Sequence, residues 1–513
     1  MGLRLNRLKP HVSAKMGCGA ATGRRCDQAA LPRGADAGGP AAPRPDGRSV
    51  GRGWEPSLTF GANGVGLKPG QQASGTETMH LEAHKGELFA SFGRWMSRDF
   101  VKKDWPNMKP FIARVESAGG RWVVDMQAQG SSRYAPRMTC LKSVTFARDR
   151  HGKDLGAPVQ QLVACFGLGG HGNFMLFRDD ADGGAGGEQH RWHEVKYTAK
   201  CADPAGDAAR AVIVHRDAVT GVDRIFALQG VRGALSGAYD PSSGAPGRVV
   251  WNEQPERLDL GSVKAKALPF RPLALAVANG KLYMSSAGWV LQRVDGPEPH
   301  WKVVVDVTSL RPTDGKLMQA VGGIRGLSAV PAPGGSGSSL LFCWNPNASS
   351  RSWILRADFE QGEDSPKVVE ETAITQLAKH YLGQGTLSYT LAAYNDIMEA
   401  PWGDGTCHLI GFETVVHGAG MKSVPLDPRQ TSAKHGFWAG GGFVVRKGAG
   451  DFEVMEVGGP RSSPAQADPA LTAVRCYKNS PFPEEAGTVY FGGYDCNSFP
   501  SDDTAWIYKG RLR

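Results

Sequence analysis

A pattern of four short apolar strands recurs along this chain of 513 residues, and it limits the possible folds more than any other feature. Each copy opens with an apolar strand, turns into a second strand of the type GKLYMSS (280–286), and often carries a Trp near its end. The pattern can be aligned seven times. The first strands of the copies start near Met79, Arg137, Arg210, Arg271, Arg325, Tyr389 and Arg475.

The composition agrees with many short strands joined by tight turns. The chain has 68 Gly and 33 Pro, and runs of helical periodicity are nearly absent. Repeating units of four strands are typical of a β-propeller, in which each sheet, or blade, packs its faces on its neighbours. We therefore predict an all-β fold, a seven-bladed β-propeller over residues 53–513. A pair of β-sandwiches is the alternative.

The last copy of the pattern has three strands before the chain ends at Arg513, so its outer edge would be unpaired. The segment WEPSLTF (54–60) has the character of the missing strand. We expect this N-terminal strand to close the ring. The same last copy, TVYFGGYDCNSFPSDDTAWIYKG (488–510), resembles a kelch repeat through Gly492–Gly493, Tyr494 and Trp506. The resemblance implies a propeller and identifies no specific family, because the other copies lack that full set.

The net charge of +9 is unevenly distributed. Residues 1–52 carry ten Lys or Arg against three acidic residues, which leaves the remainder of the chain at only +2. A nearly neutral body argues against nucleic acid as a partner. The same 52 residues are rich in Ala, Gly and Pro, and we expect them to form a disordered tail.

The sequence does not identify a localisation. The Arg-rich and Ala-rich start resembles an organellar transit peptide and has no apolar core of a secretory signal, while Met16 or Met79 are alternative starts. No apolar stretch approaches the roughly 20 residues that span a bilayer, so we expect a soluble protein without a membrane partner. The cysteines show no CxxC spacing, and we expect neither a metal nor a cofactor.

Five of the seven first strands open with Arg: Arg137, Arg210, Arg271, Arg325 and Arg475. The first strand of each propeller blade lines the central channel, so these side chains should surround one mouth of it. Guanidinium groups grip carboxylate, sulfate or phosphate through a planar fork, and we predict that the five bind an anion. Alternatively, each Arg pairs with an acidic residue of the next blade and clamps the ring. The matching positions of the other two copies fall on Tyr389, and on Glu77 or Met79.

The loops after the second strands should open beside the same mouth. His171 is flanked by glycines, Glu413 follows a strand that should be buried, and Tyr494 follows the diglycine; we take these three as candidate catalytic residues. Trp95 and Asp495 are candidate ligand-binding residues in the same loops.

These residues favour a propeller that binds or processes an anionic small molecule or oligosaccharide. An acidic carbohydrate would suit the Arg groups, as in lyases and sialidases on propeller scaffolds, and whether the chain is an enzyme is left open. The alternative is a non-catalytic propeller with structural Arg residues that docks a protein partner. A copper-radical oxidase of the kelch type is disfavoured, because no Tyr, Cys and His set with its spacing is present.

Overall fold

A computed structural model describes residues 54–512 apart from several segments, which are 62–63, 95–96, 100–108, 128–136, 169–171, 181–190, 199–207, 231–232, 262–270, 311–321, 347–351, 361–364, 383–385, 418–436, 439–440, 458–470, 472 and 495–501. The tail predicted for residues 1–52 lies outside the described part of the chain. Within the described part, no helix has the length and apolar character needed to cross a membrane.

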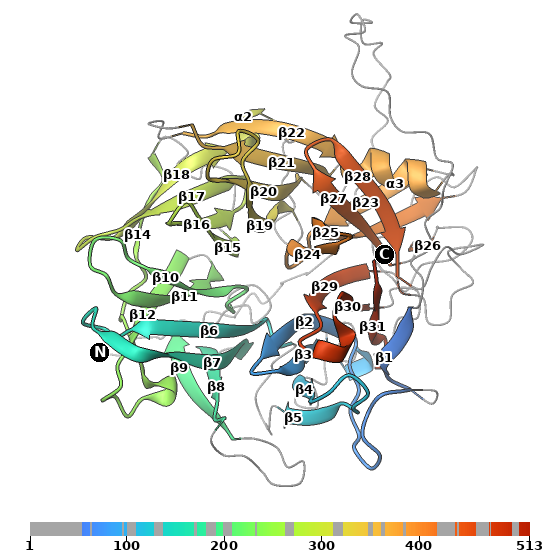
Figure 1. Cartoon of the computed structure of the whole chain (residues 1–513), viewed down its shortest axis with the longest axis horizontal. Helices are drawn as coiled ribbons and strands as arrows, with labels where there is room; N and C mark the ends of the chain where they lie inside the picture. Colours follow the sequence, from blue (N-terminus) through green and yellow to red (C-terminus); the bar gives the residue numbers. More distant parts are fainter. Residues whose placement is uncertain are drawn as a thin grey trace, which may run out of the picture.

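The chain folds into sheets arranged around a central axis, and in the four-stranded sheets the first strand lies nearest that axis (Figure 1). This arrangement makes the protein a β-propeller. Five sheets are separate blades built as antiparallel meanders, one of which also takes up the short parallel strand β14 at its edge. The blades are β2 (Glu77–His84), β3 (Glu87–Gly93), β4 (Phe111–Val115) and β5 (Val123–Gln127); β6 (Cys140–Arg148), β7 (Asp154–Leu168), β8 (Gly172–Arg178) and β9 (Trp192–Thr198); β10 (Val212–Arg216), β11 (Asp223–Gln229), β12 (Gly233–Tyr239) and β13 (Val249–Trp251); β14 (Arg257–Asp259), β15 (Pro272–Ala278), β16 (Lys281–Ser286), β17 (Trp289–Val294) and β18 (His300–Asp306); and β19 (Gly323–Pro331), β20 (Ser338–Asn345), β21 (Trp353–Asp358) and β22 (Lys367–Ala373).

The remaining strands form one sheet of ten strands. They are β1 (Glu55–Thr59), β23 (Thr386–Ala392), β24 (Met398–Trp402), β25 (Gly405–His417), β26 (Phe437–Trp438), β27 (Gly442–Gly448), β28 (Asp451–Glu456), β29 (Ala473–Asn479), β30 (Thr488–Tyr494) and β31 (Ala505–Arg511). The prediction of seven blades is therefore wrong, since the structure has five blades beside this larger sheet. The strand β25 is 13 residues long, and its Glu413 pairs with Ala473 of β29, which joins the two strand groups that the sequence pattern had separated.

The N-terminal strand β1 pairs antiparallel with β31, the last strand of the chain, so the ten-stranded sheet contains both ends of the described chain. Its Leu58 is fully buried together with Phe92, Trp122 and Ile507, in a cluster that β1 shares with the first blade and with β31. Two short helices, α2 (Val307–Leu310) and α3 (Ile374–Leu382), follow β18 and β22.

Two-residue turns set the register of the inner hairpins. Lys85 and Gly86 join β2 to β3, and Asn279 and Gly280 join β15 to β16; all four have positive φ. Two consecutive residues of positive φ match the right-handed twist of the flanking strands, and Gly or Asn adopts this conformation at little strain. The glycines of these turns therefore have a structural reason.

Arginines of the third strands tie neighbouring sheets together through ion pairs. Each has a guanidinium nitrogen within 3.2 Å of a carboxylate oxygen. The acidic residue belongs to the sheet that comes before in the chain or, in the case of Asp217, directly follows strand β10 of that sheet. We call these pairs the third-strand clamps; they are Arg178–Asp125, Arg293–Asp217 and Arg446–Glu371. Both partners of each pair are buried, so the pairs are shielded from water and from salt.

The segment between β23 and β24 reaches into the channel. Both strands pair with β25, and residues 393–397 lie between them without strand pairing. We call Ala393–Ile397 the plug segment. Its Asn395 side-chain amide donates to the backbone oxygen of Met79 on β2. Gly326 of β19 packs against the plug segment, because a Cβ at residue 326 would lie 2.5 Å from the Ala393 Cβ.

Candidate functional site

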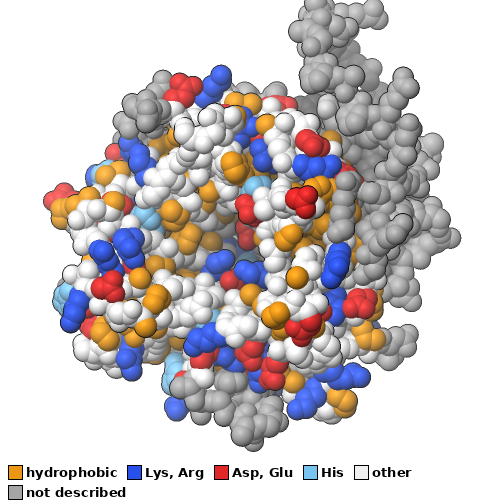
Figure 2. All heavy atoms as spheres, in the orientation of Figure 1, with side chains coloured by type: hydrophobic (Ala, Val, Ile, Leu, Met, Phe, Trp, Pro, Cys, Tyr) orange, Lys and Arg blue, Asp and Glu red, His pale blue; other side chains and the backbone are white. Residues whose placement is uncertain are grey.

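The inner strands bring the five predicted Arg residues together at one end of the channel. The positive charges of Arg137, Arg271 and Arg325 all act on Arg210. Arg475 and Arg325 both contact the ring of Tyr394. We call these five residues the arginine cluster. Figure 2 shows the molecule hollowed at the centre of the ring, where basic and acidic side chains gather. That the arginine cluster binds a ligand stays a prediction.

Tyr394 of the plug segment lies in the middle of the arginine cluster. The Arg475 guanidinium carbon is 3.7 Å from the centre of the Tyr394 ring, and that of Arg325 is 4.7 Å away. Arg325 Nη1 also donates to the backbone oxygen of Tyr394 at 2.8 Å. Since the negative face of an aromatic ring attracts cations, the ring holds two of the guanidinium groups in place.

Glu77 of β2 is an acidic neighbour of the arginine cluster. It accepts a hydrogen bond from Arg475 Nη1, and its Oε1 is 3.4 Å from Arg137 Nε. All three side chains are buried. One carboxylate therefore bridges the two Arg residues on either side of the first blade, and for Arg475 this is the kind of contact that the clamp alternative describes.

Glu413 and Tyr494 form a buried pair beside Arg475. The Tyr494 hydroxyl donates to Glu413 Oε2 at 2.6 Å, and the Arg475 guanidinium carbon is 4.1 Å from the Tyr494 ring centre. Glu413 is held in position by its backbone pairing with Ala473. Because Tyr494 donates its proton to Glu413, it is poorly placed to accept a proton from a ligand.

The electrostatics of the site are dominated by positive charge. Burial, followed by the charge of Arg137, lowers the pKa of Arg210 to about 9. The lowered pKa reflects the other positive charges close to this guanidinium group. Burial raises the pKa of the Tyr394 phenol, but the surrounding guanidinium charges, led by that of Arg475, outweigh this effect and bring the pKa down to about 7. A phenol that ionises near neutral pH can accept a proton, which an ordinary Tyr cannot.

Of the other candidates from the sequence, Glu413 and Tyr494 lie beside the arginine cluster, whereas His171, Trp95 and Asp495 lie outside the described residues. The sequence alignment matched Tyr389 to the Arg positions, whereas in the structure it is Tyr394 that lies among the Arg residues. The residues Asn395 and Asp396, which follow Tyr394, favour a turn between two strand-like runs. This pair could have predicted the plug segment from the sequence. Within the described chain, no three His, Cys, Asp or Glu side chains are grouped as metal ligands.

No protein-family model matches the chain, and no curated protein matches its sequence. Three solved structures with a similar arrangement illustrate its likeness to others. A mutant of Trypanosoma rangeli sialidase displaying trans-sialidase activity is 10% identical, with 71% of this chain and 55% of that chain covered and a TM-score of 0.34. This chain therefore spans about half the length of that sialidase.

The other two likenesses are similarly distant in sequence. The WD40 domain of SCAP from fission yeast is 9% identical, with 86% of this chain and 85% of that chain covered and a TM-score of 0.37. AofleA from Arthrobotrys oligospora is 10% identical, with 77% of this chain and 89% of that chain covered and a TM-score of 0.34. No specific family is identified.

Proposed function

We propose that the end of the channel at the arginine cluster binds an anionic ligand, and that this ligand is an acidic carbohydrate. The observation that carries the proposal is the convergence of five guanidinium groups, from the beginnings of five inner strands or the residues just before them, on the region around Tyr394. Carboxylate and sulfate groups accept paired hydrogen bonds from guanidinium, and a ligand with several such groups can engage more than one Arg.

The same geometry supports a proton-transfer reaction on a uronic acid. In a β-elimination, a base takes the proton from the carbon next to the carboxylate, the electron pair forms a carbon–carbon double bond, and the glycosidic oxygen at the next carbon leaves as an alkoxide that takes up a proton. The arginine cluster would stabilise the charge that builds on the carboxylate. We assign the role of base to Tyr394, in place of His171 or Tyr494, because its phenolate is populated near neutral pH.

The second candidate is a propeller that docks a protein partner without catalysis, with structural Arg residues. The two contacts of Glu77 with Arg137 and Arg475 favour it for those two members of the cluster. An anion-binding experiment separates the two functions, because a purely structural cluster would not require a ligand.

The experiment compares two Arg residues at opposite ends of the strand β10. Arg210 precedes the strand and belongs to the arginine cluster, whereas Arg216 ends it, with a half-exposed side chain paired to Asp223. Calorimetry with an oligogalacturonate should show binding that Arg210→Ala weakens at least tenfold and Arg216→Ala leaves unchanged. Equal binding by the two variants, or none by the wild-type protein, contradicts the proposal.

A further inference from the structure

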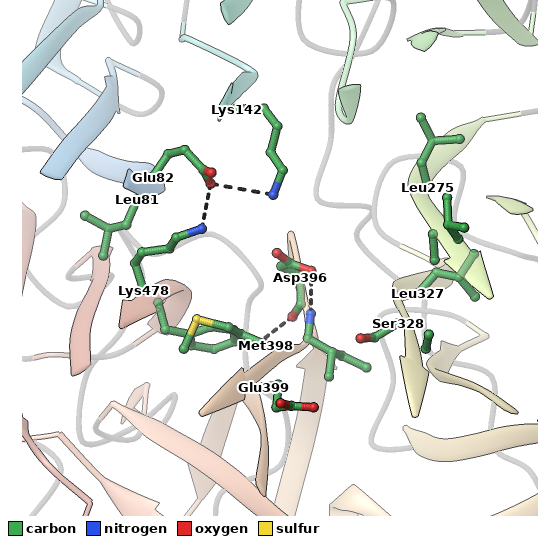
Figure 3. Close-up of a pocket in the computed structure, with 15 residues that line it drawn as sticks. Leu81, Glu82, Lys142, Leu275, Leu327, Ser328, Asp396, Met398, Glu399 and Lys478 are labelled. Carbon is green, nitrogen blue, oxygen red and sulfur yellow. Dashed lines mark hydrogen bonds and ion pairs between the residues drawn. The ribbon is translucent and has the colours of Figure 1, made fainter. Parts of the chain in front are cut away.

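A cavity of about 310 Å³ lies along the same channel, apart from the arginine cluster. Its walls come from the inner strands β2, β6, β15, β19 and β29 together with the plug segment and the start of β24 (Figure 3). None of the arginine cluster lines it. The volume is at the lower end of what small-molecule sites have, which is about 300 to 1,000 Å³.

One wall of this cavity carries a compact ionic group. Glu82 Oε2 is 3.0 Å from Lys478 Nζ and 3.6 Å from Lys142 Nζ, so one carboxylate lies between two ammonium groups (Figure 3). Glu82 is buried, and the two lysines come from strands on either side of β2. The positive charges of both lysines are thus directed toward a carboxylate of the protein.

Asp396 of the plug segment lies between this ionic group and the opposite wall (Figure 3). Its side chain is exposed in the cavity, and Oδ1 accepts the backbone N–H of Ile397 at 2.8 Å. Desolvation in the channel raises the pKa of Asp396, against the opposing effect of Lys142. A cation brought next to this carboxylate would stabilise its charged form.

The opposite wall is mainly apolar. It includes Leu275 of β15 and Leu327 of β19, with Ser328 beside them (Figure 3), and Val277 of β15 also lines the cavity. Val277 is 37% exposed, which makes it one of four large apolar side chains so exposed in the described chain. Apolar side chains facing charged groups are typical of a site for a ligand that has one charged end and one hydrocarbon end.

The charges that line the cavity decide the sign of that ligand. Glu82, Asp396 and Glu399 are acidic, and Lys142 and Lys478 are basic, so the lining has one more negative charge than positive when all five groups are ionised. His80, which lies near Glu82 and Lys142, is neutral at pH 7 because burial lowers its pKa to about 4. The local charge therefore favours a cation, whereas the arginine cluster favours an anion.

We propose that this cavity is a separate binding site for a small organic ammonium compound, with the ammonium group at Asp396 and the hydrocarbon part against Leu275, Val277 and Leu327. The site does not depend on the anion-binding function of the arginine cluster. The two sites together would let one channel bind ligands of opposite charge, an anion near Tyr394 and a cation at Asp396. These two residues are two positions apart in the plug segment.

The test uses n-hexylammonium as the probe, with n-hexanoate as its oppositely charged match and methylammonium to remove the hydrocarbon part. Calorimetry at pH 7.5 should show that the full-length protein binds n-hexylammonium at least tenfold more tightly than either of the other two. Asp396→Asn keeps the acceptor for Ile397 and should weaken n-hexylammonium binding at least tenfold. Asp404→Asn, an exposed Asp in the β24–β25 turn, is the matched control and should bind like the wild-type protein.

Failure of this proposal is distinguishable from failure of the proposed function. Arg210→Ala should leave n-hexylammonium binding unchanged whatever it does to oligogalacturonate binding. Undetectable binding of n-hexylammonium to the wild-type protein, tighter binding of n-hexanoate, or equal affinity in Asp396→Asn would each overturn the proposal.

Discussion

The lowered pKa of Tyr394 makes a prediction about the pH dependence of anion binding. A fall in the pKa from 10.0 to about 7 corresponds to about 4 kcal/mol of preferential stabilisation of the phenolate by its surroundings. A bound anion would repel the phenolate, so the ligand should bind more tightly to the form with a neutral phenol, whereas the more weakly binding phenolate form is the one that can act as the base. Below pH 7 the neutral form predominates, and above pH 7 its population falls tenfold per pH unit. The dissociation constant for an oligogalacturonate should therefore rise about tenfold from pH 6 to pH 8.

The assay has two parts. Absorbance near 295 nm, where phenolate absorbs, should show one Tyr titrating near pH 7 in the wild-type protein and none in Tyr394→Phe. Tyr283→Phe is the control, because burial raises the pKa of Tyr283 to about 12 and its loss should leave the step near pH 7 in place. Calorimetry should show that Tyr394→Phe also removes the rise in dissociation constant between pH 6 and pH 8. A wild-type protein with no phenolate absorbance below pH 9 would refute the reasoning.

Three further predictions concern packing, acid stability and the Glu77 bridge. Gly326→Ala should lower the unfolding free energy by about 1 to 3 kcal/mol, measured by denaturant titration, because φ is +64° and the new Cβ would meet Ala393. His408 is buried and its pKa is lowered to about 4, so the unfolded chain binds more protons between pH 4 and 6.5; stability should fall by up to about 3 kcal/mol as the pH drops through that range, and less in His408→Asn. Glu77→Gln should lower the melting temperature while tightening anion binding, because it removes a negative charge from the arginine cluster; weaker anion binding in a folded variant would contradict this.

The sequence predicted the strands and the arginine cluster because both repeat. An apolar strand followed by a Gly-containing turn is a local pattern, and Arg at the start of that strand inherits its position in the channel from the strand. The number of separate blades could not be read in the same way. Whether a sheet ends depends on hydrogen bonds beyond the strand pattern, and the pair Glu413–Ala473 continues one sheet where the pattern indicated two.

Tyr394 and Asp396 were missed for a related reason. They lie in a segment that interrupts one inner strand and has no counterpart in the other copies, so the alignment placed Tyr389 at the corresponding position. Their partners come from distant strands: Arg325 of β19 and Tyr477 of β29 bond to the backbone of this segment. Such contacts between distant parts of the chain cannot be inferred from a periodic pattern.

The order of the arginine cluster along the ring bears on whether it exists for structure alone. A clamp requires an acidic group opposite each Arg, as Glu77 provides for Arg137 and Arg475. Four members of the cluster, however, lie within or just before the consecutive inner strands β6, β10, β15 and β19, and the charges of Arg137, Arg271 and Arg325 all lower the pKa of Arg210. Like charges held this close repel one another. One third-strand clamp, Arg293–Asp217, already joins two of these sheets. A multiply charged anion bound among these guanidinium groups would offset that repulsion, and this is how the proposed anion-binding function differs from a clamp.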